Sequence, residues 1–298
     1  MSSLLNSEFM SHKTVPPPDG CDAVRADGAW EDGGETVTGV DGCAGGWVAV
    51  TLAPVGPGEG QQRAGGQRAG GQRAGEQGAG EQGADHWGPA DFPAPGLPAV
   101  TVTVAATLDA LPLSTVTGID MPLGLLATGW RDVDQLARKA LGRRWMTVFA
   151  IPPRPVWECA TYAEANRACR DLTGKGFSVQ AWGLRHKIAE ADACRRRARA
   201  ATPPVRLHEV HPELAFAAMA GAPLLNSKHT RPGLARRREL LAAEGIVLPP
   251  RIAGAAEDDL LDAAAVAWSA RRITAGNAES FINPSQRAAD NSEIAIFY

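Results

Sequence analysis

The sequence predicts an α/β protein in which a mixed β-sheet is flanked by helices. Three observations support this fold class. Short β-branched runs bounded by Gly, Pro or Asp lie between residues 36 and 120, Ala/Leu/Arg-rich stretches of helical length follow them, and one further β-type run interrupts those stretches. Strand-rich and helix-rich segments that combine in this way are typical of a sheet covered by helices.

The β-type runs predict strands, and the first two flank a tight Gly-rich turn, so we expect them to form a hairpin. A final apolar run at 294–297 is expected to return to the edge of the sheet. The strands are expected at residues 36–41, 47–52, 99–105, 115–120 and 205–210. The helices are expected at residues 133–141, 162–172, 179–199, 213–219, 233–243 and 257–272.

Two segments have compositions that do not form a core. Residues 1–35 contain three consecutive prolines and seven acidic against two basic side chains, with almost no apolar periodicity, which predicts a disordered acidic leader. Residues 57–98 contain five-residue repeats of the type QRAGG, which predict a flexible low-complexity insertion. We therefore expect residues 36–298 to form one domain that carries this insertion.

Composition excludes several classes of protein. The chain has 298 residues and a formal net charge of −3. No stretch approaches the ~18 uninterrupted apolar residues of a membrane helix, and the N-terminus lacks the pattern of a signal peptide, so a soluble cytoplasmic protein is expected, with no membrane partner. The five cysteines include no C-x-x-C pair, which favours reduced structural thiols over a zinc knuckle.

Two predicted strands end in the same short pattern, which is Gly, an aliphatic residue and Asp. The carboxylates concerned are Asp41 and Asp120. A carboxylate at the end of an apolar strand lies where α/β sheets usually place their functional site. Capping of a turn is the alternative interpretation of each aspartate taken alone.

Two further predicted elements carry acidic residues. Glu209 lies in the run at 205–210, where it faces either a functional cleft or solvent, or pairs with an arginine. Asp259 and Asp262 are three residues apart on the predicted helix at 257–272 and so share one face. The helix dipole favours acids in a first turn, but this explains Asp262 less well, because it opens a closely packed Ala run.

Convergence of these acidic positions would create a cation site. Unpaired carboxylates in one cleft repel each other, and a hard divalent cation such as Mg²⁺ or Mn²⁺ is the usual compensation. Two such ions about 4 Å apart can activate water and stabilise the leaving oxygen of a phosphodiester. The candidate ligands are Asp41, Asp120, Glu209, Asp259 and Asp262.

Basic clusters lie at residues 131–154, 185–206 and 226–238. Positive surface beside an acidic metal site is expected of an enzyme that binds a phosphate backbone, so nucleic acid is the expected partner. The candidate phosphate contacts are Arg143, Arg144 and Lys228. Solvated helical faces in an Arg-rich chain are the alternative explanation of these clusters.

Five motifs resemble a known family. They are GVDGCAGGW, GIDMPLG, QAWGL, EVHPE and DDLLDA, in this order between roughly residues 37 and 275. Together they resemble the DUF429 family of predicted nucleases. The resemblance implies a ribonuclease H-like fold, in which acidic residues surround two metal ions. Those residues would be Asp41 on the first strand, Glu209 or Asp120 on later strands, and Asp259 or Asp262 on the last helix.

Three functions remain open from the sequence. The first is a metal-dependent nuclease or phosphodiesterase that acts on DNA or RNA, with Asp41, Asp120, Glu209 and Asp262 as its catalytic residues. The second is a nucleotide-binding phosphotransferase of the actin-like or sugar-kinase type, which requires a second, duplicated domain. The third is a catalytically inactive module of the same fold that binds nucleic acid or protein.

Overall fold

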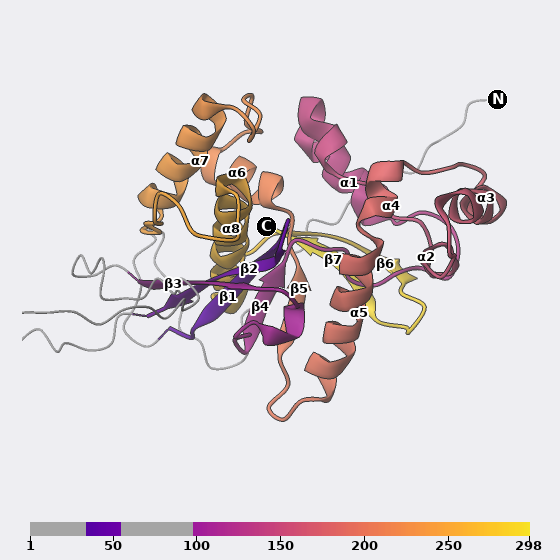
Figure 1. The fold of residues 1–298 in the computed structure, drawn as a ribbon, viewed down its shortest axis with the longest axis horizontal. Coiled ribbons are helices and arrows are strands. Elements are labelled where there is room, and N and C mark those ends of the chain that lie inside the picture. Colours follow the sequence, from indigo (N-terminus) through magenta and orange to yellow (C-terminus); the bar gives the residue numbers. More distant parts are fainter. Residues whose placement is uncertain (1–33, 55–97) are drawn as a thin grey trace, which may run out of the picture.

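The computed structural model describes residues 34–54 and 98–298. Apart from residues 34, 35 and 98, the predicted leader at 1–35 and the predicted insertion at 57–98 lie outside the described residues. Within the described ranges the chain forms a five-stranded sheet in the order β3-β2-β1-β4-β5, flanked by helices, as predicted (Figure 1). The strands are β1 (Val37–Cys43), β2 (Gly46–Ala53), β3 (Ala99–Ala105), β4 (Val116–Ile119) and β5 (Arg206–Glu209).

The sheet combines antiparallel and parallel pairs. Strands β1 and β2 form the predicted antiparallel hairpin, and β3 extends it on the other side of β2. The turn requires glycine at Gly46, whose φ is +142° and where a Cβ atom would lie 2.2 Å from the carbonyl oxygen of Ala105. Strands β4 and β5 continue the sheet in parallel to β1. The carboxyl ends of β1, β4 and β5 therefore meet at one edge of the sheet.

Helices cover both faces of this sheet (Figure 1). The core on one face includes residues of α6, α7 and α8, and that on the other face includes residues of α5. The predicted helix at 179–199 is two helices, because α4 ends at Gly183 and α5 begins at Arg185. The helices are α1 (Asp132–Leu141), α2 (Arg154–Trp157), α3 (Tyr162–Thr173), α4 (Val179–Gly183), α5 (Arg185–Ala200), α6 (Pro212–Ala220), α7 (Arg231–Ala243) and α8 (Glu257–Thr274), with 3₁₀ turns η2 (Leu108–Ala110) and η3 (Gly142–Thr147).

Helix α8 packs directly on the backbone of the two central strands. Gly39 of β1 and Gly118 of β4 are register partners. A Cβ atom added to Gly39 would lie 2.0 Å from the backbone nitrogen of Ala267, and one added to Gly118 would lie 2.7 Å from a methyl carbon of Val266. The two glycines thus form a flat strip on which the Ala-rich helix rests.

A second, two-stranded sheet lies beside β5. It pairs β6 (Ser280–Arg287) with β7 (Glu293–Phe297) in antiparallel fashion. The apolar run predicted at 294–297 is thus a strand, but among the described residues its link to the chain at the end of β5 is a single bridge between Val210 and Phe297. No helix in the described part of the chain combines the length and the hydrophobicity that a membrane crossing needs.

The contact between α8 and the glycine strip gives a first prediction. Gly39→Ala should lower the free energy of unfolding by about 3 kcal/mol or prevent folding, because the new methyl group meets helix backbone that has no room to move. Gly183→Ala is the matched control, since no atom lies within 4 Å of its added Cβ. Urea denaturation of both variants measures the difference, and equal midpoints would contradict the packing argument.

Candidate metal centre

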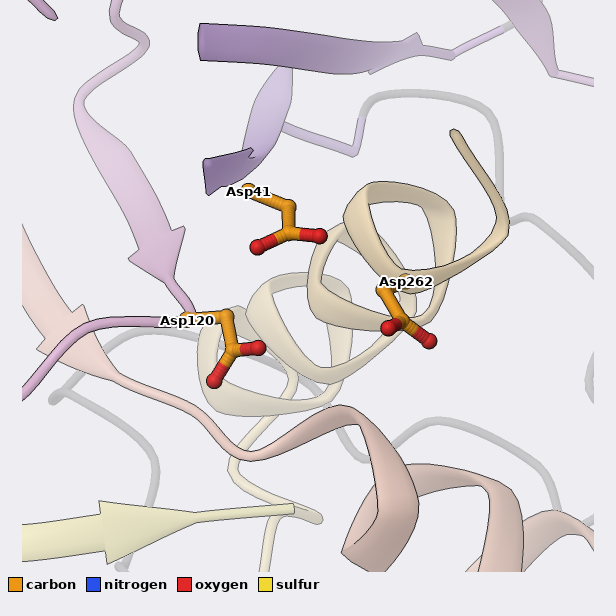
Figure 2. A group of neighbouring side chains, drawn as sticks. All are labelled: Asp41, Asp120 and Asp262. Carbon is orange, nitrogen blue, oxygen red and sulfur yellow. The ribbon is translucent and has the colours of Figure 1, made fainter. Parts of the chain in front are cut away.

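Three aspartates from separate elements meet at the carboxyl edge of the sheet. Asp41 lies near the end of β1, Asp120 directly follows β4, and Asp262 lies in the second turn of α8. One carboxylate oxygen of each lies within 4.8 Å of one oxygen of each of the others. Figure 2 shows the three side chains gathered between the strand ends and the helix. The sequence-predicted convergence is therefore found for these three carboxylates.

Strand register explains how they come together. In β1, residues alternate between the two faces, so Asp41 shares the face of Gly39, on which α8 rests. The parallel pairing of β1 with β4 places Gly118 beside Gly39. The amide of Asp120 continues this pairing by donating to the carbonyl of Val40 at 2.9 Å. The repeated Gly-aliphatic-Asp pattern thus aligns both carboxylates below the helix.

Burial and mutual repulsion change the titration of all three groups. Burial raises the pKa of Asp41 well above its ordinary value, and the charges of Asp120 and Asp262 raise it further. Burial also raises the pKa of Asp120 to about 7 and that of Asp262 to about 7, against the opposing charge of Lys228. Metal-free protein at neutral pH therefore holds part of this cluster in the protonated form.

Lys228 is the cation nearest to Asp262. Its ammonium nitrogen lies 2.5 Å from Oδ2 of Asp262 and 3.6 Å from a carboxylate oxygen of Asp258. The other carboxylate oxygen of Asp262, Oδ1, is buried and has no hydrogen-bond partner among the described residues. Asp41 accepts a hydrogen bond of 2.6 Å from the amide of Gly42. The single ammonium group of Lys228 thus does not balance the charges of the three carboxylates, and Oδ1 of Asp262 has no hydrogen-bond donor among the described residues.

Glu209, predicted as a fourth ligand, has different surroundings. It pairs with Ile119 across the parallel register, so its side chain lies on the opposite face of the sheet from the three aspartates. One of its oxygens binds the buried guanidinium of Arg131, and the other accepts from the amide of Leu123 at 2.7 Å. Arg131 also binds Asp134 at 3.0 Å. Two carboxylates thus share one guanidinium, and burial raises the pKa of Glu209 to about 7. Glu209 lines the same cavity as the three aspartates but does not belong to their cluster.

Three other predicted site residues, Asp259, Arg144 and Arg143, are not members of the aspartate cluster. Asp259 is half-buried at the start of α8 and does not belong to the group of three, although its charge acts on Asp41. Arg144 lines the cavity beside the aspartates, where it binds Glu213 at 3.1 Å. Arg143 is exposed and is not among the cavity-lining residues.

Sequence reasoning missed Glu213. This residue, in the first turn of α6, is 5% exposed, and its Oε1 accepts from both Arg144 and Arg237, the latter at 2.6 Å. Its Oε2 is buried without a partner in the described part of the chain, and its charge contributes to the raised pKa values of Asp120 and Asp262. Glu213 lies in the first helical turn after β5, close to a strand end as Asp41 and Asp120 are, and this position was the available signal.

A cavity of about 370 Å³ opens over the cluster. Its wall combines the acidic group with basic residues from three different elements or loops, including Lys187, which sequence reasoning did not single out. The acidic and basic lining residues are Asp41, Asp120, Asp134, Glu209, Glu213, Asp262, Arg144, Lys187 and Lys228, beside His211 and His229. A cation bound by the carboxylates, together with an anionic group bound by the basic residues, would match this arrangement of charges.

The donor set fits a hard divalent cation. Three carboxylates offer the oxygen ligands that Mg²⁺ and Mn²⁺ prefer. The buried Oδ1 of Asp262, which has no hydrogen-bond partner among the described residues, is available to bind such a cation. Fold and cluster together define an α/β protein with a candidate divalent-metal centre at the carboxyl edge of its sheet. A family model described as "Protein of unknown function (DUF429)" matches residues 39–287, and the chain belongs to that family. The chain matches no curated protein and no solved structure.

Proton competition at the cluster gives a prediction for metal binding. At pH 8, millimolar Mn²⁺ should raise the melting temperature by about 5 °C or more, because a ligand that binds only the folded state stabilises it. At pH 6 the rise in melting temperature should be smaller. The pKa values of Asp120 and Asp262 are near 7, so both groups are then mostly protonated and the metal ion must displace their protons. Asp262→Asn should abolish the shift, and a shift that survives in this variant would contradict the site.

Repulsion in the metal-free cluster gives a second prediction. When a carboxylate has a higher pKa in the folded than in the unfolded state, the folded protein becomes less stable as the pH rises between the two pKa values. For Asp120 this interval runs from about 4 to about 7. In chelator at pH 8, Asp120→Asn should therefore raise the free energy of unfolding by roughly 2 kcal/mol, with little change at pH 4. Asp171→Asn, at an exposed position of α3, is the control. A destabilised Asp120 variant at pH 8 would refute this account.

Proposed function

We propose that this protein is a divalent-metal-dependent phosphodiesterase that hydrolyses nucleic acid. The observation that carries the proposal is the group of Asp41, Asp120 and Asp262, which three separate elements bring within 4.8 Å. A protein gains nothing in stability from gathering like charges in a buried place unless a cation compensates them. The same residues hold the charge pattern that hydrolysis of a phosphodiester needs.

The chain would hold Mg²⁺ or Mn²⁺ through the carboxylate oxygens of these aspartates. When bound, such ions supply an activated water and stabilisation of the leaving oxygen. The protein's own part is to fix the ligands. Asp41 is oriented by the amide of Gly42, and Asp262 by the ammonium group of Lys228. Lys228 and Arg144 line the cavity and pair with Asp262 and Glu213, and in this proposal they would also contact a phosphate.

The fold proposed for this domain, residues 36–298, is ribonuclease H-like. Support comes from the strand order β3-β2-β1-β4-β5, in which an antiparallel three-stranded half joins a parallel half at β1. The last long helix crosses the central strands and delivers the third acidic residue. Glu209, by contrast, acts in this proposal as a structural partner of Arg131 and not as a ligand.

The phosphotransferase alternative has less support. It requires a duplicated domain, whereas the residues that the structure describes form a single five-stranded sheet with one two-stranded sheet beside it. The inactive-module alternative shares the cavity and its basic wall. It differs from the proposal only in expecting no catalysis, so an activity measurement decides between them.

The test is cleavage of labelled single-stranded, double-stranded, hybrid and branched nucleic acids, with Mn²⁺ or with chelator. We expect cleavage that needs the metal and falls at least about 100-fold in Asp262→Asn and in Asp41→Asn. Asp171→Asn should retain full activity and controls for the effect of an Asp→Asn change as such, whereas the loss in Asp262→Asn and Asp41→Asn, purified in the same way, excludes a contaminating nuclease. Binding without cleavage by any metal-loaded preparation would favour the inactive module, and binding of ATP with Mg²⁺ would favour the phosphotransferase.

A further inference from the structure

An exposed aromatic residue directly follows a residue that lines the cavity over the aspartates. The turn η3 carries Trp145, which is 48% exposed, and Met146, which is 70% exposed. The residue before them, Arg144, lines the cavity over the aspartates. Large apolar side chains are costly to leave in water, and few in the described part of the chain are so placed. The exposure of Trp145, between the cavity-lining residues Arg144 and Thr147, therefore calls for an explanation.

The turn holds Trp145 in a fixed place. The guanidinium carbon of Arg138 lies 5.3 Å from the centre of the Trp145 ring, a cation–π contact that supports the ring from the side of α1. Arg138 is itself fixed, because its Nε donates to the carbonyl of Val148 at 2.8 Å. The hydroxyl of Thr147 donates to the carbonyl of Arg144 at 2.8 Å and closes the turn. Arg138 thus contacts the ring, while Trp145 remains 48% exposed.

The segment of the chain around Trp145 is rich in basic residues, of which Arg144 also pairs with Glu213. Between residues 135 and 157 the sequence has no acidic residue, whereas it has Arg138, Lys139, Arg143 and Arg144 near Trp145. Arg143 is exposed beside it. An apolar ring among basic side chains is complementary to a ligand that presents a flat π-surface together with phosphate groups.

We propose that Trp145 is a stacking platform for an unpaired base of the nucleic acid, with Arg143 and Arg144 contacting the adjacent phosphates. This inference rests on the proposed function for the class of ligand and adds that the strand beside the centre is single. In a duplex, both faces of each base are covered by neighbouring base pairs, so the ring has no π-face to meet. An unpaired base leaves such a π-face uncovered, so it can stack on the Trp145 ring.

Binding in chelator, where no metal-dependent cleavage occurs, tests the platform on the full chain. The probes are fluorescent 15-nucleotide strands of thymidylate and of uridylate, an abasic strand of the same length, and a blunt duplex. Trp145→Ala should weaken binding of both base-bearing strands about tenfold and that of the abasic strand less than twofold, because only bases stack. Trp145→Phe should retain affinity within about threefold. Val179→Ala, at another exposed apolar position, should change nothing.

Three results would overturn the inference. They are unchanged affinity in Trp145→Ala, an equal loss on the base-bearing and abasic strands, and duplex binding as tight as that of the single strands. A change of oligomeric state in Trp145→Ala, measured by sedimentation, together with unchanged strand affinity would assign the ring to a second copy of the chain instead. Because the readout is binding without metal, failure of the phosphodiesterase proposal shows as absent cleavage while the Trp145 effect persists.

Discussion

The contact of helix α8 with the paired glycines of β1 and β4 is the constraint on which the candidate centre depends. Gly39 and Gly118 stand side by side, and helix atoms occupy the space that larger side chains would need. Small residues on the helix complete this interface, so its backbone lies at a fixed height above the strands. Because Asp262 belongs to that helix and Asp41 follows Gly39 by two residues, their separation is set by backbone packing and not by long, adaptable side chains.

Gathering three carboxylates in this place stores electrostatic free energy in the metal-free protein. Lys228 offsets a part of it, and protonation offsets another part, because the pKa values of Asp120 and Asp262 lie near 7. A divalent ion that relieves the repulsion gains the corresponding free energy on binding. At Glu209 a part of the compensation comes from the protein itself, because the buried guanidinium of Arg131 binds the carboxylates of both Glu209 and Asp134.

Much of the fold could be predicted from local patterns. The strands of the five-stranded sheet, the hairpin and the long last helix follow from β-branched runs, a Gly-rich turn and an Ala-rich stretch. β6 could not be found in this way, because Asn283 and Pro284 interrupt its apolar pattern. The face on which Glu209 lies depends on the pairing of β4 with β5, which no single strand reveals. The role of Glu213 depends in the same way on arginines that approach from two distant segments.

The pairing of Ala53 with Ala99 has a practical meaning for the molecule. Strand β2 leaves the sheet, and β3 re-enters it, at the end opposite to the one where β1, β4 and β5 terminate. These two strand ends therefore lie at the edge of the sheet away from the aspartates. A fluorophore or a carrier domain attached at either of these strand ends would leave the edge that carries the three aspartates uncovered.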